Sequence, residues 1–392
     1  MKYTRVTEQL AGLGSDKWVL NAAARKRMSE GHRVINLTIG EPDVPTPDSL
    51  IETACTAMRA GRTGYSNGRG EPVLLDALSR RYTTRLNRPF GHDRFLCLPG
   101  TQTSLYLVFR TICEPGCEVI LGDPMYATYE GIVRASGAVP VPVQLKAEHN
   151  FRLQAADVAA VITPETRAIF LNTPHNPTGA ILQPAELRAL GELARDHDLW
   201  IVSDEVYGDL THDGRPFTSA LADPEFEDRT ITTASISKSH AAPGFRSGWA
   251  VGPAEFTLRA LPLSETMLFG SQPFIADMTA EAIGSAPTLA QGMAARMARR
   301  AQILFDRLDG VARLRVHRPE AGMFALIDIR ALSDNSLAFA LELLEATDVA
   351  MMPGASFGVA LEGWLRVALN ASDADTEEAC ARIAAYAMQK AA

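Results

Sequence analysis

Short apolar or β-branched runs alternate with longer amphipathic stretches from about residue 94 onward. The short runs predict strands at 94–98, 118–121, 138–143, 168–172, 199–203, 230–235 and 249–252. Between them, apolar residues recur at helical spacing in segments such as 101–113, 126–136 and 184–197, which predicts helices. Strands that alternate with helices indicate βαβ units. We therefore expect an α/β fold with a mostly parallel sheet flanked by helices.

The pattern changes after about residue 285. A long helical segment at 289–308 leads into predicted strands at 314–317 and 323–329, and predicted helices at 336–346 and 376–390 enclose strands near 349–352 and 364–369. This arrangement is typical of a smaller α+β domain. The first forty or so residues are too few to form a domain alone. The sequence thus predicts a large domain at 45–287 and a small domain built from 1–44 and 288–392.

Composition and charge narrow the class of protein. The 392 residues carry 38 Lys and Arg against 46 Asp and Glu, so the net charge of −8 argues against a nucleic-acid partner. Neither a membrane-spanning apolar stretch nor the apolar core of a signal peptide is present. The five cysteines are odd in number and form no CxxC motif or Cys/His cluster, so we expect no metal site. These features predict a cytoplasmic protein.

Polar residues follow several predicted strands, at the edge of the sheet where ligands bind. Lys238 and Arg246 lie at adjacent strand ends among several hydroxyls, which suits a phosphate. A desolvated Lys238 beside another cation would offer a neutral amine as a nucleophile, whereas a solvated surface lysine is the simpler alternative. Asp204 follows the strand at 199–203, either as a helix cap or as a carboxylate that faces a ring nitrogen. The Tyr207 hydroxyl would then reach the same ligand.

Two further loops end at this edge of the sheet. The loop at 172–179 contains Asn176 before Pro177, which keeps Asn176 away from the helical region. Thr101 and Gln102 join a strand to a helix, so the backbone N–H groups there would hold a phosphate. Taken alone, each loop also has the composition of an ordinary connection between a strand and a helix.

The motifs at 176–179 (Asn-Pro-Thr-Gly), 203–207 (Ser-Asp-Glu-Val-Tyr) and 235–238 (Ser-Ile-Ser-Lys) occur in an order and spacing that resembles the class I/II aminotransferases. The resemblance covers nearly the whole chain, from Gly40 to Arg366. It implies a fold-type I pyridoxal-phosphate enzyme, with a seven-stranded, mostly parallel sheet in the large domain. The implied reaction is reversible amino-group transfer between an L-amino acid and a 2-oxo acid, with pyridoxal 5'-phosphate as cofactor.

The resemblance also implies roles for single residues at the cofactor. Lys238 would carry the cofactor as a Schiff base and later move the proton at the substrate α-carbon. Asp204 would pair with the pyridine nitrogen, while Asn176 and Tyr207 would bind the phenolic oxygen. Tyr126 would stack on the ring, unless it is a core aromatic residue. The phosphate would be held by Thr101, Gln102, Ser235 and Arg246.

Further implied roles concern the substrate and the assembly. Arg366 would clamp the substrate α-carboxylate with help from Gly40 and Asn176. Trp18 would line the side-chain pocket, unless it is a core or interface residue. Tyr65 would reach the phosphate of the neighbouring subunit, which makes the active unit a homodimer.

The sequence bears on the amino donor as well. Many aspartate aminotransferases have an arginine in the stretch that corresponds to 267–274, but this chain has no cation there. A pocket dedicated to dicarboxylates is therefore not expected. The stretches at 123–130, 237–241 and 269–277 look most like those of the arginine–pyruvate transaminases. A guanidinium group would need a carboxylate partner, and Asp277 or Glu265 would provide it unless each is a solvated helix acid.

Three alternatives stay open. The chain resembles aspartate-type or aromatic-type aminotransferases over the same motifs. Related pyridoxal-phosphate scaffolds also act as lyases or oxidases, and these differ in pocket details that one sequence does not expose. Finally, Ser235 and Lys238 match the S-x-x-K of serine acyl-enzymes and residues 333–335 supply an S-D-N, although no K-T-G follows.

Overall fold

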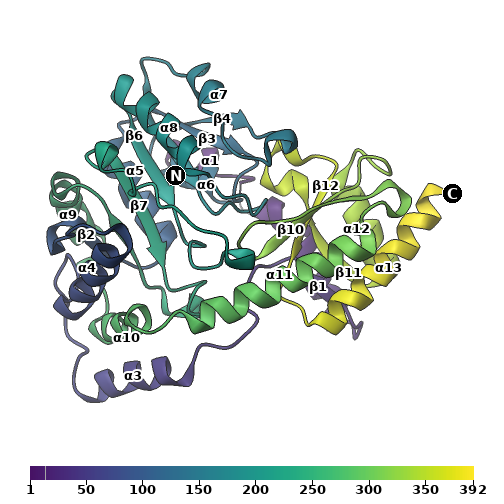
Figure 1. Cartoon of the computed structure of the whole chain (residues 1–392), viewed down its shortest axis with the longest axis horizontal. Helices are drawn as coiled ribbons and strands as arrows, with labels where there is room; N and C mark the ends of the chain where they lie inside the picture. Colours follow the sequence, from purple (N-terminus) through teal and green to yellow (C-terminus); the bar gives the residue numbers. More distant parts are fainter. Residues whose placement is uncertain (14) are drawn as a thin grey trace.

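The strands form two sheets in the computed structural model, which describes residues 1–13 and 15–392. The larger sheet has the strand order β2-β8-β7-β6-β5-β3-β4 and the smaller one β1-β11-β12-β10-β9. Figure 1 shows the larger sheet with its helices on the left and the smaller sheet on the right.

Every strand of the larger sheet begins within two residues of its predicted start. The strands are β2 (Phe95–Leu98), β3 (Glu118–Asp123), β4 (Val139–Gln144), β5 (Thr166–Asn172), β6 (Trp200–Asp204), β7 (Thr230–Ser235) and β8 (Gly248–Val251). All neighbouring strands pair in parallel except β8, which is antiparallel to both β7 and β2. Most of these strands are buried runs of apolar and β-branched residues, as expected of a sheet covered on both faces. The prediction of a mostly parallel α/β sheet is confirmed.

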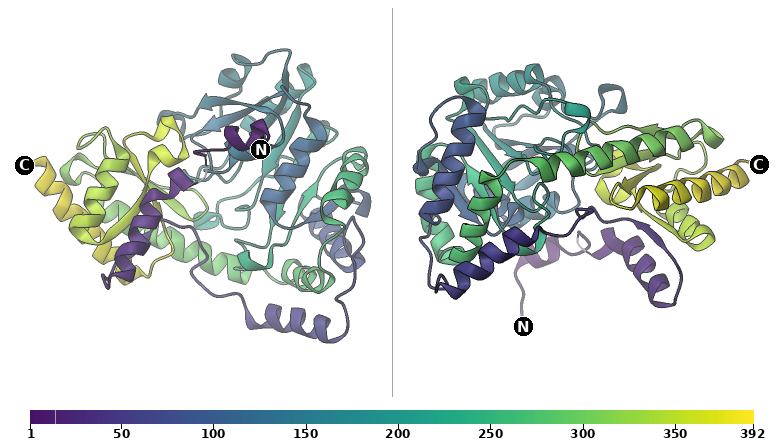
Figure 2. Two further views of the ribbon diagram at one scale, coloured as in Figure 1. Left: turned by 180° about the vertical axis from the view of Figure 1, so that it is seen from behind. Right: turned by 60° about the horizontal axis from the view of Figure 1, so that its bottom comes forward.

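Helices surround this sheet in both figures of the whole chain (Figures 1 and 2). They are α3 (Asp48–Arg59), α4 (Pro72–Leu86), α5 (Thr101–Ile112), α6 (Tyr129–Ala135), α7 (Ala155–Ala159), α8 (Pro184–Asp196), α9 (Ala254–Leu268) and α10 (Pro273–Gly284). The helix predicted at 126–136 begins three residues late, and the Met125 amide just before the turn donates to the Phe357 carbonyl. Tyr126 therefore lies in the turn after β3.

The smaller sheet contains residues from both halves of the sequence. Its strands are β1 (Ile35–Leu37), β9 (Arg315–His317), β10 (Phe324–Asp328), β11 (Val349–Pro353) and β12 (Trp364–Ala368). Its helices are α2 (Val19–Ser29), α11 (Thr288–Leu308), α12 (Ser336–Thr347) and α13 (Asp373–Ala391). The register pairs Ile35 of β1 with Val349 of β11, in parallel.

The short helix α1 (Arg5–Gln9) lies apart from this sheet and packs against α6. The first residues of the chain therefore contact the larger part of the molecule. The domain boundaries at 44/45 and 287/288 stay a prediction.

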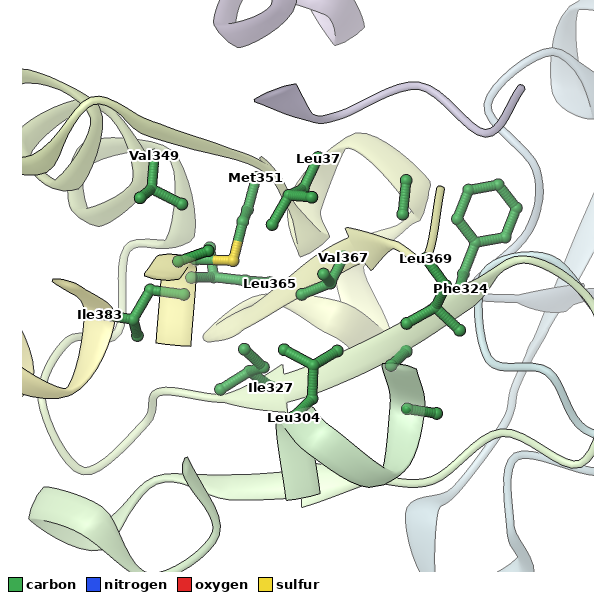
Figure 3. Packing of buried hydrophobic residues seen from close by; sticks show 14 of the residues in the cluster. Leu37, Leu304, Phe324, Ile327, Val349, Met351, Leu365, Val367, Leu369 and Ile383 are labelled. Atoms are coloured by element: carbon green, nitrogen blue, oxygen red, sulfur yellow. The ribbon is translucent and has the colours of Figure 1, made fainter. Parts of the chain in front are cut away.

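A buried apolar cluster joins the smaller sheet to its helices (Figure 3). It includes Leu37 of β1, Met351 of β11, Leu365 and Val367 of β12, Ile327 of β10, Leu304 of α11 and Ile383 of α13. Because the side chains of β1 are packed in this core, the position of the segment that begins at residue 38 is fixed at its first residue. Within the described residues, no helix has the length and apolar character needed to cross a membrane.

Candidate active site

A cavity of about 360 Å³ lies at the carboxyl ends of β5, β6 and β7. Tyr65 and the candidate acids Asp277 and Glu265 do not line it. The other predicted site residues do, namely Trp18, Gly40, Thr101, Gln102, Tyr126, Asn176, Asp204, Tyr207, Ser235, Lys238, Arg246 and Arg366. These residues come from both sheets and from the loops that connect them. Their chemical roles stay predictions.

Lys238 lies just beyond β7, and its Nζ donates to the Gly40 carbonyl at 2.7 Å. Burial lowers the pKa of Lys238 to about 8, and the nearby cations Arg366 and Arg246 act in the same direction. The carboxylates of Glu41 and Asp204 oppose this shift. Near neutral pH, a far larger fraction of this amine is therefore neutral than of an ordinary lysine.

Asp204 ends β6 and is buried, with each carboxylate oxygen bound by a donor. Tyr129 Oη donates to Oδ2 at 2.8 Å, and the Val206 amide donates to Oδ1 at 3.1 Å. Burial raises the pKa of Asp204 to about 6, while the Tyr129 hydroxyl, the Val206 amide and Lys238 pull it down. Sequence reasoning missed Tyr129, because an aromatic residue at the start of a helix looks like any core residue.

Asn176 and Tyr207 lie together in the cavity. Asn176 Nδ2 donates to Tyr207 Oη at 3.4 Å, and the Asn172 side chain accepts from the Asn176 amide at 2.8 Å. Asn176 Oδ1 also accepts from Arg366 Nη1 at 3.2 Å. Asn176 thus connects the tyrosine hydroxyl to the guanidinium.

The start of α5 has the features of an anion site. Gly100, with φ of 83°, precedes the helix, and no side chain caps it. Thr101 Oγ1 is buried and has no hydrogen-bond partner among the residues that the structure describes. A Cβ atom added at Gly100 would lie 2.3 Å from Arg246 Nη2, so the guanidinium is close to this helix terminus. Free backbone N–H groups, an unpaired hydroxyl and a cation are the donors that bind a phosphate.

Arg366 is the central residue of β12 and its side chain is completely enclosed. Its guanidinium lies between the rings of Phe324 and Phe357, at 4.0 and 4.2 Å from their centroids. Nη2 donates to the Thr38 carbonyl at 2.5 Å, while the buried Nε has no partner in the described part of the chain. Burial lowers the pKa of Arg366 to about 9. A carboxylate entering the cavity would supply the missing acceptor.

Three acids that bear on the amino donor differ in their surroundings. Asp277 accepts from Arg62 Nη2 at 2.7 Å, and neither Asp277 nor Glu265 lines the cavity of its own chain. Glu41 does line it, and no side chain in the described residues pairs with it. Sequence reasoning missed Glu41 because nothing in the pattern separates it from a solvated loop acid.

Tyr65 lies outside the cavity of its own chain. Its side chain is 89% exposed and contacts the ring of Phe269, with 4.6 Å between the centroids. A role in this cavity would therefore require a second copy of the chain.

The donor set fits pyridoxal 5'-phosphate. The buried Lys238 amine suits an aldehyde, the Asp204 carboxylate suits a protonated ring nitrogen, and the unpaired Thr101 hydroxyl beside Arg246 suits a phosphate. Across residues 1–13 and 15–392, no group of three or more His, Cys, Asp or Glu side chains is arranged to hold a metal ion.

Comparisons with known proteins agree with this chemistry. A family model described as aminotransferase class I and II matches residues 32–383. The chain is 39% identical over 389 residues to arginine–pyruvate transaminase AruH of Pseudomonas aeruginosa, covering 99% of each. It is 32% identical to the aspartate/prephenate aminotransferase of Thermus thermophilus, covering 93% of this chain and 94% of that protein. The solved aspartate aminotransferase from Rhizobium meliloti matches with a TM-score of 0.93 at 27% identity, covering 99% of each chain. The chain therefore belongs to the class I and II aminotransferases and is a pyridoxal-phosphate-dependent transaminase.

Proposed function

We propose that this transaminase moves an amino group reversibly between arginine, or another basic or neutral L-amino acid, and a 2-oxo acid such as pyruvate. The observation that carries the proposal is the cavity itself. Lys238, Asp204 and Arg366 line one cavity, so an amine, a carboxylate and a guanidinium face a single bound amino acid. The site residues have the roles that the family resemblance implies.

Arg366 binds the α-carboxylate of the substrate through its unpaired Nε and its neighbouring amino group. This contact orients the α-carbon toward Lys238. The Lys238 amine would accept the proton from the α-carbon and pass it to the bound cofactor. Pyridoxal phosphate, when bound, supplies the electron sink that makes the α-proton acidic. Asp204 stabilises the positive charge on the ring nitrogen, and Asn176 and Tyr207 bind the phenolic oxygen.

The choice of a cationic donor rests on three observations. A relative that covers 99% of the chain is named as an arginine–pyruvate transaminase. Segment 267–274 carries no cation for a second carboxylate. Glu41 lines the cavity with its carboxylate unpaired among the described residues, and an arginine side chain would supply the partner.

The proposed role of Lys238 is tested by Lys238→Ala. We expect the variant to lose both turnover and the visible absorption band of the cofactor-loaded enzyme. Lys146→Ala is the matched control, because Lys146 is half-exposed and pairs only with Asp157 at the surface. A Lys238→Ala protein with wild-type activity would rule the proposal out.

The amino donor is tested with a panel of amino acids and pyruvate as the acceptor. We expect arginine to have the highest kcat/KM. In Glu41→Gln, kcat/KM should fall about tenfold more for arginine than for alanine. The lost effect of Glu41 on Lys238 acts on both donors, whereas only arginine has a charge for Glu41 to meet. If aspartate or an aromatic amino acid reacts far faster than arginine, the proposed donor is wrong.

We also propose that the active unit is a homodimer. Tyr65 and Phe269, whose rings are in contact, expose apolar side chains, with 89% and 60% of their surface accessible. Exposed apolar patches of this kind mark interaction sites. Sedimentation of the purified protein tests the proposal, and a monomer that keeps full activity would contradict it.

All five cysteines are free thiols, which suits the cytoplasm as the compartment.

A further inference from the structure

Residues 38–43, which we call the strap, leave β1 and pass through the active site. Three successive carbonyls of the strap each accept a side-chain hydrogen bond. The pairs are Arg366 Nη2 to Thr38 O (2.5 Å), Asn370 Nδ2 to Ile39 O (3.0 Å) and Lys238 Nζ to Gly40 O (2.7 Å). The same short segment therefore contacts the group proposed to bind the α-carboxylate and the group proposed to move the proton.

Asp43 ends the strap and is bound tightly to the helix α11. Its side chain is only 3% exposed. Arg296 donates to both carboxylate oxygens, from Nε at 2.6 Å and from Nη2 at 2.9 Å, and Arg300 Nη1 donates at 2.8 Å. Burial alone would raise the pKa of Asp43, but the two arginines hold it below its ordinary value. Asp43 is therefore a charged anchor with two partners.

The anchor is connected to the rest of the active site from the other side as well. Arg300 Nη1 also donates to the Leu369 carbonyl at 2.9 Å, directly before Asn370, whose side chain binds the strap. Figure 2 shows α11, in green, running from the larger part of the molecule along the smaller sheet. Both ends of the strap are thus fixed, by β1 at one end and by α11 at the other.

We infer that Asp43, Arg296 and Arg300 form a positioning device for the reaction. They fix the strap so that Gly40 O binds the Lys238 amine while Thr38 O orients the Arg366 guanidinium. This inference rests on the proposed roles of Lys238 and Arg366. A buried carboxylate with two cationic partners costs desolvation energy and is a poor way to gain stability alone, which favours a role in geometry.

The substitution Asp43→Asn tests the inference, because it keeps the shape of the side chain and removes its charge. Arg296 and Arg300 then lose their shared anion, and the strap is expected to shift. The dissociation constant of the α-methyl derivative of the best amino donor, which has no α-proton to lose, should rise about tenfold. Its binding is followed by the change in cofactor absorption. The isotope effect on turnover of the α-deuterated donor should also rise, since a misplaced amine slows proton transfer.

Two further variants separate positioning from folding. Asp348→Asn is the matched control, because Asp348 accepts from Arg27 Nε at 2.8 Å in another ion pair of the smaller domain that does not line the cavity. Arg296→Gln removes one of the two partners of Asp43, so it should change both readouts in the same direction but less. All proteins are compared well below their melting temperatures.

Two quantities are compared with those of Asp348→Asn: the dissociation constant of the α-methyl derivative and the isotope effect on turnover. The inference is overturned if both are the same in Asp43→Asn and Arg296→Gln as in Asp348→Asn. Every amino acid carries the same α-carboxylate, so the result does not depend on arginine being the donor. Hydrogen–deuterium exchange of the cofactor-free proteins adds a readout that needs no catalysis. Residues 38–43 should exchange faster in Asp43→Asn than in Asp348→Asn. Faster exchange without a change in binding would mean that the anchor is structural, and this also contradicts the inference.

Discussion

Tyr129 lines the cavity, and its hydroxyl binds the Asp204 carboxylate. The pKa of Asp204 is raised to about 6 by burial, and the Tyr129 hydroxyl is the first of the groups that oppose this shift. The hydroxyl stabilises the charged form of the carboxylate, which is the form that pairs with a protonated ring nitrogen. Together with the Val206 amide and Lys238, this phenol therefore favours the ionised form of the buried acid.

We predict that Tyr129→Phe weakens cofactor binding about tenfold, because a hydrogen bond to a charged group contributes about 1.5 kcal/mol. Equilibrium titration of the cofactor-free protein with pyridoxal phosphate measures the effect. Tyr386→Phe is the control, since Tyr386 Oη donates to Glu342 at 3.1 Å far from the cavity. Equal affinities of the two variants would contradict the prediction.

Glu205, next to Asp204, predicts a pH dependence of stability. Burial raises the pKa of Glu205 from 4.5 to about 7, although Ser219 and Ala220 donate to it. The Glu205 carboxyl therefore holds a proton more tightly in the folded protein than in the unfolded chain. The resulting stabilisation is complete below pH 4.5 and is lost as the pH rises through 7, a change of about 3 kcal/mol.

We therefore expect Glu205→Gln to flatten the dependence of the free energy of unfolding on pH between 5 and 7. Urea unfolding of the cofactor-free protein at several pH values is the measurement. The difference between wild type and variant should shrink toward low pH, where Glu205 is already neutral. A constant difference across this range would mean that Glu205 does not titrate in it.

Most cavity residues could be predicted from the sequence because they follow buried strands within short motifs. Asp204 and Ser235 end β6 and β7, and Asn176 follows β5, so one sheet edge collects all three. Phe324 and Phe357 could not be predicted in the same way. Their contact with Arg366 depends on which strands and loops are neighbours in space, and no local pattern contains that information.

At the scale of elements, two loops are fitted closely together beside Arg366. The turn after β3 meets the loop after η8 (Gly354–Phe357), where the Met125 amide donates to the Phe357 carbonyl at 2.7 Å. Gly358 follows with φ of 139°, and a Cβ atom there would lie 1.7 Å from Asp123 Oδ1. Only a glycine allows both the backbone angle and the approach of the carboxylate.

We predict that Gly358→Ala lowers the free energy of unfolding by about 2 kcal/mol or more and raises KM for the amino donor several-fold. The first effect comes from backbone strain and the second from displacement of Phe357 against Arg366. Chemical denaturation and steady-state kinetics measure them. Adding Asp123→Ser should restore part of the loss, and Gly284→Ala is the control because a Cβ there meets nothing within 4 Å. Equal behaviour of the two alanine variants would contradict the prediction.

Element positions could be predicted closely for the larger sheet because its strands are continuous apolar runs between helical patterns. The strand β1 was not predicted, since it spans only Ile35–Leu37 and its partner β11 lies far along the chain. The late start of α6 was also missed. The turn before it is bound to a distant loop through the Met125 amide and the Phe357 carbonyl.

At the scale of the whole molecule, the exposed Tyr65 predicts a specific behaviour of mixed dimers. Lys238→Ala and Tyr65→Ala homodimers should both be defective. A hybrid with one subunit of each kind should regain about half of the wild-type activity, because one of its two sites then has an intact Lys238 and an intact Tyr65 from the neighbour.

Hybrids are isolated with two affinity tags and assayed at saturating cofactor. If Tyr65 acted within its own chain, the subunit with an intact Lys238 would still carry the Tyr65 defect. The hybrid would then be no more active than half of the Tyr65→Ala homodimer, and the shared site would be excluded.

The pairing of β1 with β11 has a consequence for how the protein is made. More than three hundred residues separate Leu37 from Val349, so β1 leaves the ribosome long before its partner strand exists. At about 5 to 20 residues per second, β1 and the strap remain unpaired for roughly 15 to 60 s. During that time the larger sheet can form, while the cavity still lacks the residue that β12 supplies. A nascent chain released before β12 is made would therefore have Lys238 but lack Arg366.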